Sequence, residues 1–483
     1  MKYILGIDQS TAGTKAALMD QQGRLSHAVR RRHQQYYPAP GYVEHDAEEI
    51  WQNVKALMAE AAQGVDKADI AGVSISNQRE TTVIWERATG KPVHRAIVWQ
   101  DVRAKGLTDS LADRADFVRR TTGLMLSPYF SAAKAAAVLK ANPDLMARAQ
   151  AGELCFGTVD SYLLYRMTDG KSFKTEVSNA SRTQLMDLHT LKWSVELADM
   201  FGLPMSMLAD EICMSDADFG EVTAVESLRG VHVRSMLGDS HAALYGHGCV
   251  KPGMVKATYG TGSSIMMNVG DKPVLCEGGL SSSVGFGAKG RVCYVLEGNV
   301  TCSADTLMWL KDELQLISSM DDLAEASQVE STGGVYLIPA FAGLGAPWFY
   351  ENARAMLFGM NRGTRRAHVI RAALESIAHQ NADVMDAMGR DANCPVTALE
   401  ADGGGSVNPL LMQMQSDLVP CKVTVPAERE VSLLGAAMLA GHGTGMLPEN
   451  VQLPLEAEYT PAMTDEQRQA SRAGWLDALK RCR

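Results

Sequence analysis

The chain has 483 residues, of which 46% are hydrophobic and 21% charged, and its formal net charge is −10. This length exceeds what one hydrophobic core usually organises, so we expect two domains, and the ordinary composition excludes long disordered segments. The acidic balance gives no sign of a nucleic-acid-binding surface, so we expect no nucleic-acid partner.

Nine cysteines are scattered along the chain, and none of them forms a C-x-x-C pair. Their odd number and the length of the chain favour reduced thiols in a cytoplasmic protein over a disulfide framework. The opening "MKYILGIDQS" has an apolar run too short for the core of a signal peptide, and nothing further along approaches a membrane span. We therefore expect a cytoplasmic protein with no membrane partner.

The first predicted elements form a hairpin. "YILGID" at 3–8 is typical of a buried strand, "QSTAGT" of a turn, and "KAALMD" of a second strand. The dinucleotide-binding fingerprint and the Walker phosphate loop both require a strand, a glycine loop and then a helix, and neither motif occurs. A nucleotide would therefore have to be held in another way.

Helical and extended patterns follow the hairpin. Apolar residues recur at helical spacing in 45–63, with Asp46 as the candidate N-cap. "IAGVSISNQRETTVIWE" at 70–86 alternates apolar and polar residues, which predicts paired strands. The mixture of strands and helices indicates an α/β architecture.

A weak internal repeat suggests how the chain is divided. "GIDQSTAGTKAALMD" at 6–20 and "KATYGTGSSIMMNVG" at 256–270 both predict a strand, a turn of small residues and a second strand. Two related domains that present these turns to a shared cleft would explain the repeat, and two unrelated hairpins would explain it equally well. The turn "CVKPG" places the boundary between residues 1–247 and 248–483.

One ionisable acid, Asp239, lies between a strand-like segment, "VHVRSML" at 231–237, and a helix-like segment, "HAALYGHG" at 241–248. With Asp239 and the segments quoted below, the chain resembles the FGGY carbohydrate kinases, and among them the glycerol kinases. The resemblance extends over nearly the whole chain and includes, in order, "PGYVEHDAEEIW", "SNQRETTVIWE", "SNASRT", "TYGTG", "IPAFAGLGAPW" and "DGGGSVNPLLMQMQSD". It implies an α/β protein of two ribonuclease-H-like domains, of the actin and sugar-kinase type, around a hinged cleft.

The resemblance also implies an activity, the transfer of a phosphoryl group from ATP to a hydroxyl of a small polyol or sugar. Asp239 would accept the proton of that hydroxyl, and Asp8, with Asp239, would hold Mg²⁺ through water. Taken alone, Asp8 is equally compatible with a turn-initiating aspartate. The implied nucleotide contacts are Thr11, Ala12, Gly13 and Lys15 in the first hairpin, Thr261 and Gly262 in the second, and Ala304, Met308, Gly404 and Asn408 around the adenosine.

Some of these positions depart from the family pattern. Ser10, Ala12 and Gly13 stand where the family has Gly, Thr and Ser, and Ala304 and Met308 stand where it has Gly and Gln. Backbone contacts to phosphate survive such changes, whereas side-chain contacts at Ala12 and Met308 do not. ATP and Mg²⁺ remain the expected cofactors.

The expected acceptor site combines shared and altered positions. Arg79, Glu80, Trp99, Tyr129 and Asp239 match the residues that bind glycerol in the glycerol kinases. An exposed charge pair would also explain Arg79 and Glu80, and core packing would explain Trp99. Three further positions differ from that pattern, namely Asp101, Ser240 and Ser264.

These differences predict a larger and more polar acceptor pocket. Ser240 and Ser264 remove the bulk of a Gln and a Phe, and Asp101 adds an acceptor in a "W-x-D-x-R" pattern that also occurs in pentulose kinases. We therefore expect a polyol or ketose of four or five carbons. The alternatives are a glycerol kinase proper, a pentulose kinase such as xylulokinase, an actin-type or chaperone-type ATPase without an acceptor, and a sugar-binding protein that has lost catalysis. The expected assembly is a homodimer or homotetramer.

Overall fold

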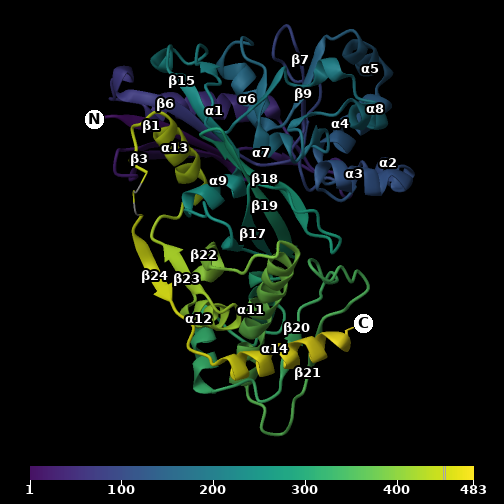
Figure 1. Cartoon of the computed structure of the whole chain (residues 1–483), viewed down its shortest axis with the longest axis vertical. Helices are drawn as coiled ribbons and strands as arrows, with labels where there is room; N and C mark the ends of the chain where they lie inside the picture. Colours follow the sequence, from purple (N-terminus) through teal and green to yellow (C-terminus); the bar gives the residue numbers. More distant parts are fainter. Residues whose placement is uncertain (450, 452, 483) are drawn as a thin grey trace.

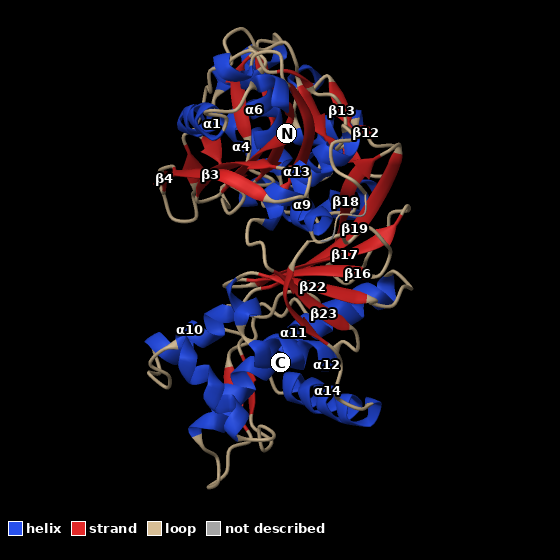
Figure 2. Ribbon diagram, turned by 90° about the vertical axis from the view of Figure 1, so that its left-hand side faces the viewer, coloured by secondary structure: helices blue, strands red, loops and turns tan. Residues whose placement is uncertain are grey.

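The computed structural model describes residues 1–449, 451 and 453–482. Figures 1 and 2 show two bodies, one built mainly from the first half of the chain and the other from the second half. Each body contains one large β-sheet. Within the described residues, no helix has the length and apolar character that a membrane crossing requires.

The first sheet contains six strands in the order β14-β15-β6-β1-β2-β3. β1 is parallel to β6, β6 is parallel to β15, and β2 is antiparallel to β1 and β3. The strands are β1 (Tyr3–Ser10), β2 (Gly13–Met19), β3 (Leu25–Arg32), β6 (Ile70–Asn77), β14 (Gly220–Glu221) and β15 (His232–Gly238).

The second sheet repeats this arrangement. Its seven strands follow the order β18-β19-β17-β16-β22-β23-β24, in which β16, β22 and β23 are parallel and β17 is antiparallel to β16 and β19. The strands are β16 (Met254–Tyr259), β17 (Ser263–Gly270), β18 (Ser281–Ala288), β19 (Arg291–Val300), β22 (Ala398–Asp402), β23 (Lys422–Pro426) and β24 (Leu455–Tyr459). The β16–β17 hairpin is thus the counterpart of β1–β2, which confirms the reading of the weak repeat as two related domains.

Helices cover both sheets (Figures 1 and 2). The first sheet packs against α1 on one face, and α11 and α12 cover the face of the second sheet that lies away from the first body. The helices are α1 (Ala47–Ala61), α2 (Lys105–Ser110), α3 (Ala115–Thr122), α4 (Ser131–Ala141), α5 (Pro143–Gln150), α6 (Val159–Met167), α7 (Val177–Ala180), α8 (Val195–Phe201), α9 (Asp239–Gly246), α10 (Ala304–Asp312), α11 (Arg366–Asp391), α12 (Pro409–Leu418), α13 (Val431–Gly443) and α14 (Asp465–Lys480).

Short strands complete the fold outside the two large sheets. They form one three-stranded and several two-stranded sheets. They are β4 (Gln35–Tyr36), β5 (Glu44–His45), β7 (Val83–Glu86), β8 (Ala96–Ile97), β9 (Leu154–Gly157), β10 (Lys174–Glu176), β11 (Met186–Asp187), β12 (Lys192–Trp193), β13 (Glu211–Cys213), β20 (Tyr336–Ile338) and β21 (Met356–Phe358).

Local predictions agree with these elements, but one pairing was predicted wrongly. The β1–β2 hairpin, helix α1 with Asp46 as its N-cap, and the β15–α9 unit are confirmed. The two strands within 70–86 do not pair with each other. β6 lies between β1 and β15 in the first sheet, whereas β7 pairs with β9 in a separate two-stranded sheet. A central parallel strand takes its partners from distant segments, which alternation within one segment cannot reveal.

Helix α13 joins the two bodies. It belongs to the second half of the chain, but it packs on β1, β6 and α9 of the first body (Figure 1). On β1, Leu5 and Ile7 contact the core beneath α1, while Ile4 faces α13. Asp8 lies on the same side of the strand as Ile4, because side chains alternate along β1, and it is therefore directed toward the cleft between the bodies. The boundary at residue 247 stays a prediction.

Candidate active site

Three cavities contain predicted site residues, and two of them adjoin each other in the cleft between the two bodies. The first, which we call the Arg79 cavity, measures about 360 Å³ and contains Arg79, Glu80, Trp99 and Tyr129. The second, the Lys256 cavity, measures about 320 Å³ and contains Asp8, Lys15, Lys256 and Asp402. These two cavities share four residues, namely Asp239, Ser240, Thr258 and Ser264. Because Asp239 lines both cavities, its carboxylate can contact a molecule bound in either of them.

The third cavity, the Met308 cavity, lies in the second body and measures about 680 Å³. Four predicted nucleotide-binding residues line it together, namely Ala304, Met308, Gly404 and Asn408. The lining is largely apolar, which suits a flat aromatic ring. Asn408 Oδ1 accepts a hydrogen bond from Leu411 N at 2.9 Å as the N-cap of α12, so the amide nitrogen is the group left for a ligand.

Aromatic rings form one side of the Arg79 cavity. Trp99 and Tyr129 meet edge to face with ring centroids 5.7 Å apart. Trp99 Nε1 donates to Thr11 Oγ1 at 3.0 Å, which ties this aromatic side to the turn of the first hairpin. Thr11 therefore lies against the Arg79 cavity and its hydroxyl is engaged by Trp99, whereas the sequence predicted that it contacts phosphate.

A buried charge network supports the same cavity. Arg79 donates from Nη1 and Nη2 to Glu297 at 2.9 and 2.8 Å, and Arg182 Nε donates to Glu80 Oε1 at 2.6 Å. Arg182 also lies 3.0 Å from Glu297. Burial alone would raise the pKa of Glu297, but the charges of Arg182 and Arg79 hold it below its usual range. Each arginine and each glutamate of the network is thus paired, as buried charged groups in proteins usually are.

The network crosses the cleft. Arg79 and Glu80 follow β6 in the first body, while Glu297 lies on β19 of the second sheet. Glu80 has a positive φ of 57°, which is uncommon for a residue with a side chain. Such strain persists only where the surroundings hold it, as the contact with Arg182 does here.

Asp239 is the first residue of α9 and is partly open to the cleft, with a side chain 34% exposed. Its Oδ1 accepts from Ser240 N at 2.6 Å and lies 3.3 Å from Arg79 Nε. The residue before it, Gly238, lies against Arg79, since a Cβ at Gly238 would lie 2.6 Å from Arg79 Cγ.

The Lys256 cavity concentrates charged groups of both signs. Burial, together with the negative charge of Asp239, raises the pKa of Asp8 to about 6, although the hydrogen bond from Ser76 Oγ at 2.7 Å acts in the opposite direction. Lys256 is fully buried on β16, and burial lowers its pKa. Lys15 lies 2.5 Å from Glu430 at the edge of the cavity.

Asp402 and His247 form a further pair at this cavity, with His247 Nε2 2.7 Å from Asp402 Oδ2. Burial would raise the pKa of Asp402, but the contact with His247 lowers it to about 2. Lys15 and Lys256 in this cavity can donate hydrogen bonds, which is what the oxygens of a phosphate chain require.

The prediction for Asp101 is wrong. Asp101 is fully buried, and it lies outside the three cavities. Its Oδ2 accepts from Val43 N at 2.7 Å and its Oδ1 from Arg103 N at 2.8 Å, while the Arg103 guanidinium contacts both oxygens. Both carboxylate oxygens are therefore occupied within the protein, and none is directed to a sugar hydroxyl.

Three predicted phosphate-binding residues, Ala12, Gly13 and Thr261, lie at the hairpin turns outside these three cavities, and Gly262 lines the Arg79 cavity. The structure supplies a packing reason for the two glycines. A Cβ at Gly13 would lie 2.4 Å from Arg31 O, and one at Gly262 would lie 2.4 Å from Val300 O. In each hairpin the glycine thus allows the neighbouring strand to approach, whether or not a phosphate binds.

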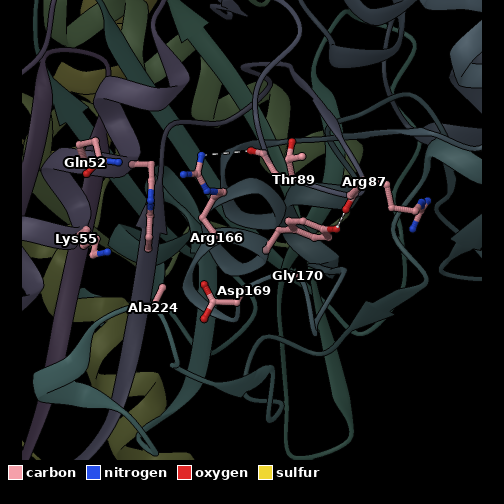
Figure 3. A pocket seen from close by; sticks show the side chains of 12 residues that line it. Gln52, Lys55, Arg87, Thr89, Arg166, Asp169, Gly170 and Ala224 are labelled. Atoms are coloured by element: carbon pink, nitrogen blue, oxygen red, sulfur yellow. Dashed lines mark hydrogen bonds between the residues drawn. The ribbon is translucent and has the colours of Figure 1, made fainter.

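A fourth cavity, of about 550 Å³, lies between α1 and α6 and shares no residue with the other three (Figure 3). Its charged groups are largely paired within the protein. Arg166 donates to Glu48 at 2.5 and 3.1 Å and to Gly90 O at 3.2 Å, and Asp169 accepts from Thr223 at 2.7 Å. We assign no function to this cavity.

Several residues of the site were missed by the sequence reasoning, namely Arg182, His247, Lys256, Glu297, Asn299 and Asp402. For two of these residues, the sequence contains a feature that could have indicated them. Glu297 is an isolated acid in the apolar run "CYVLEGNV", as Asp239 is in its own segment, and Arg182 lies within "SNASRT", which carries part of the resemblance.

Two sheets of the same topology, a charged cleft between them and a half-open aspartate on the cleft side of the first body define a sugar-kinase-type phosphotransferase. The family comparison agrees, because residues 3–246 match the N-terminal domain and residues 255–444 the C-terminal domain of the FGGY family of carbohydrate kinases. The chain belongs to this family and is an ATP-dependent phosphotransferase that acts on an alcohol group.

Among curated relatives, the glycerol kinase of Halorhodospira halophila is 44% identical, covering 99% of this chain and 96% of the relative. The glycerol kinase of Shewanella baltica (strain OS223) is 42% identical, covering 100% and 99%. The crystal structure of Plasmodium falciparum glycerol kinase with ADP has a TM-score of 0.94 at 33% identity, covering 100% of this chain and 98% of that chain. A xylulose kinase from Lactobacillus acidophilus has a TM-score of 0.88 at 20% identity, covering 99% and 97%, and shows the shared fold alone.

Proposed function

We propose that this kinase phosphorylates a polyol or ketose of four or five carbons in the Arg79 cavity. The observation that carries the proposal is the pair of serines, Ser240 and Ser264, where the Arg79 and Lys256 cavities meet. By the resemblance, glycerol kinases have a Gln and a Phe there. Two small polar side chains leave room and hydrogen-bonding capacity for a longer acceptor, while Arg79 and Glu80 can bind a diol as donor and acceptor.

In the proposed reaction, Asp239 accepts the proton of the reacting hydroxyl. The oxygen of that hydroxyl forms a bond to the γ-phosphorus of ATP as the bond between that phosphorus and the β,γ-bridging oxygen breaks, which gives ADP and a phosphorylated acceptor. Two observations support this role for Asp239: it lines both cavities, and its Oδ1 accepts a hydrogen bond from Ser240 N. The phosphate chain would lie in the Lys256 cavity and the adenosine in the Met308 cavity.

Mg²⁺ fits the residues of the Lys256 cavity. Asp8 is a buried carboxylate whose pKa is raised to about 6 by burial and by the nearby charge of Asp239, so a cation there would relieve an unfavourable concentration of negative charge. Within the described residues, no group of three or more His, Cys, Asp or Glu forms a metal site. Two carboxylates of this cavity, Asp8 and Asp239, suit Mg²⁺, which takes one or two carboxylates and completes its shell with phosphate oxygens and water. Asp8 and Asp239 would hold the ion, which would neutralise charge on the phosphates.

A screen of ADP release over polyols and ketoses tests the proposal. We expect a higher kcat/KM for at least one tetritol, pentitol, tetrulose or pentulose than for glycerol. In Asp239→Asn, kcat should fall by about 10²–10⁴-fold while KM for the acceptor changes little, because a general base contributes about that much. Asp109→Asn, at an exposed ion pair on α2, is the matched control and should keep wild-type turnover. Near-normal turnover of Asp239→Asn would remove Asp239 as the base.

Glycerol kinase proper is the second candidate, because relatives that share 42–44% identity over the full chain carry that name. Glycerol would have to be the best acceptor in the screen for this candidate to hold. We further propose that the protein is cytoplasmic, which its nine free thiols support, and that it assembles as a homodimer or homotetramer. Light scattering of the purified protein would measure the assembly.

A further inference from the structure

The second sheet presents a row of polar side chains to the Arg79 cavity. Thr258 on β16 is the direct cross-strand partner of Ser264 on β17, and Ser264 is the direct partner of Asn299 on β19. Directly opposite residues in antiparallel strands lie side by side on one face of a sheet. All three side chains line the Arg79 cavity, so the row faces the acceptor site.

The opposite face of these strands confirms the orientation. Ala257, Tyr259 and Ile265, which alternate with the row, are buried in the core of the second body. Two residues before Asn299 on the same strand, Glu297 contacts Arg79 across the cleft. Because side chains two apart on a strand share a face, Asn299 is directed into the cleft as Glu297 is.

Two members of the row have unused hydrogen-bonding groups. Ser264 Oγ is buried and has no partner among the described residues. The Asn299 side chain is exposed to the cavity, and its amide makes no hydrogen bond to any described residue. Thr258, by contrast, is engaged with Asp402. A buried hydroxyl without a partner is costly, and an amide can both donate to and accept from a sugar hydroxyl.

We propose that Asn299 and Ser264 together bind an acceptor hydroxyl that the first body does not contact. This inference rests on the proposed function and names its substrate class more closely, as a linear polyol or ketose with at least four hydroxyl or carbonyl oxygens. Arg79, Glu80, Tyr129 and Asp239 in the same cavity offer enough polar groups for the three oxygens of glycerol, so glycerol would leave the pair on the second sheet without a partner. A site with polar groups left unpaired by the shorter analogue discriminates against it.

The position of the pair adds a second consequence. Arg79, Glu80 and Tyr129 belong to the first body, while Ser264 and Asn299 belong to the second. An acceptor that reaches all of them is bound by both bodies at once. Asn299 is thus a specificity-determining residue that the acceptor engages only when it extends across the cleft.

The test compares wild type, Ser264→Ala, Asn299→Ala and the double variant on glycerol, erythritol, the pentitols and the corresponding ketoses. We expect Asn299→Ala to lower kcat/KM for the preferred longer acceptor by about 10–100-fold, mostly through KM, because one or two hydrogen bonds to that ligand are lost. The kcat/KM for glycerol, which does not reach Asn299, should change by less than about 3-fold. Binding of the acceptor without ATP, measured by calorimetry, should weaken to the same extent. Glycerol turnover by each variant also shows that the variant is folded.

Ser282→Ala is the matched control for Ser264→Ala. Ser282 lies on β18 of the same sheet, and its Oγ is also buried without a partner among the described residues, but it does not line the Arg79 cavity. For Ser282→Ala, we expect kcat/KM for the long acceptor divided by kcat/KM for glycerol to equal the wild-type ratio.

The outcomes separate the inference from the proposed function. A wild type that prefers longer acceptors, with a ratio kept within about 3-fold in both Asn299→Ala and Ser264→Ala, overturns the inference and leaves the proposed function standing. An equal fall of the ratio in Ser282→Ala also overturns the inference, because the effect would then not depend on the cavity. A wild type that prefers glycerol to every longer acceptor overturns both.

Discussion

Glu297 is the carboxylate of the buried network that contacts both arginines, Arg79 and Arg182. Glu297→Gln keeps the shape of the side chain and removes its charge. The two guanidinium groups would then be left with one carboxylate too few in a buried site, and an amide NH₂ would face an arginine donor. We expect the free energy of unfolding to fall by about 3–5 kcal/mol, which is typical of breaking a buried ion pair. Urea denaturation followed by circular dichroism measures this change.

The same substitution at an exposed ion pair is the control. Glu226 contacts Arg229 at 2.8 Å on the surface, where its side chain is 84% exposed. Surface pairs contribute little, so Glu226→Gln should unfold at the wild-type urea concentration within error. Equal midpoints for the two variants would show that the cross-cleft network does not stabilise the protein.

At the scale of residues, motifs that stand together in the sequence were predictable and distant partners were not. Arg79 and Glu80 are adjacent, and they lie in the cavity as expected. Glu297 lies 218 residues from its partner Arg79, so only the fold brings the two together. Asp101 shows the opposite error, because its spacing from Trp99 resembled a binding motif while the Val43 backbone, which occupies its carboxylate, is 58 residues away.

Among the elements, the contact between α9 and α13 fixes the start of the site helix. Gly435 on α13 lies against α9, and a Cβ there would lie 1.9 Å from Ala242 O and 2.7 Å from Gly246 N. Backbone atoms cannot move aside as a flexible side chain can. We therefore expect Gly435→Ala to lower the free energy of unfolding by about 1–3 kcal/mol, the usual cost of overpacking. Because Asp239 is the first residue of α9, a shift of this helix should also lower kcat.

Gly443→Ala is the control within the same helix. A Cβ at Gly443 would meet nothing closer than Asp216 Cβ at 3.6 Å, which is ordinary contact. Because alanine favours a helix over glycine, this variant should show between no change and a gain of about 1 kcal/mol in thermal or urea unfolding. If Gly435→Ala and Gly443→Ala change the free energy of unfolding equally, Gly435 is not needed for the close packing of α9 on α13.

Elements whose signal is local were the predictable ones. The turn residues between β1 and β2, the N-cap of α1 and the strand before Asp239 are each encoded within about ten residues, as such local signals usually are. The pairing of β6 with β1 and β15 depends on segments up to 161 positions apart, as in the register of Ser76 with Leu237, which lies two residues before Asp239. Alternation within 70–86 could not show those partners, and it led to the wrong pairing of β6 with β7.

For the molecule as a whole, the repeat of one sheet topology divides the predicted site residues between the two bodies. The first body supplies Arg79, Glu80 and Tyr129, while the Met308 cavity belongs to the second. The weak repeat of the two hairpins was enough to suggest two related domains. It could not show that α13 returns to pack on the first sheet, since a uniformly apolar helix carries no mark of which sheet it covers.

This division predicts that the two substrates draw the bodies together. In the proposed reaction, chemistry at Asp239 requires the acceptor in the Arg79 cavity and the phosphate chain in the Lys256 cavity at the same time, with water excluded so that ATP is not hydrolysed. We expect the radius of gyration measured by small-angle X-ray scattering to decrease when the acceptor and a non-hydrolysable ATP analogue are both present, and to decrease less with either ligand alone.

Asp239→Asn separates closure from chemistry in this measurement. The variant keeps the side-chain volume and the other contacts of the acceptor, so it should close with both ligands as the wild type does although it turns over slowly. Asn299→Ala should close less with the long acceptor, because it loses a contact made by the second body, and should close normally with glycerol. A radius of gyration that does not change with saturating acceptor and nucleotide would show that the cleft is already in its reactive arrangement, and that the charge pair between Arg79 and Glu297 holds it there before substrate binds.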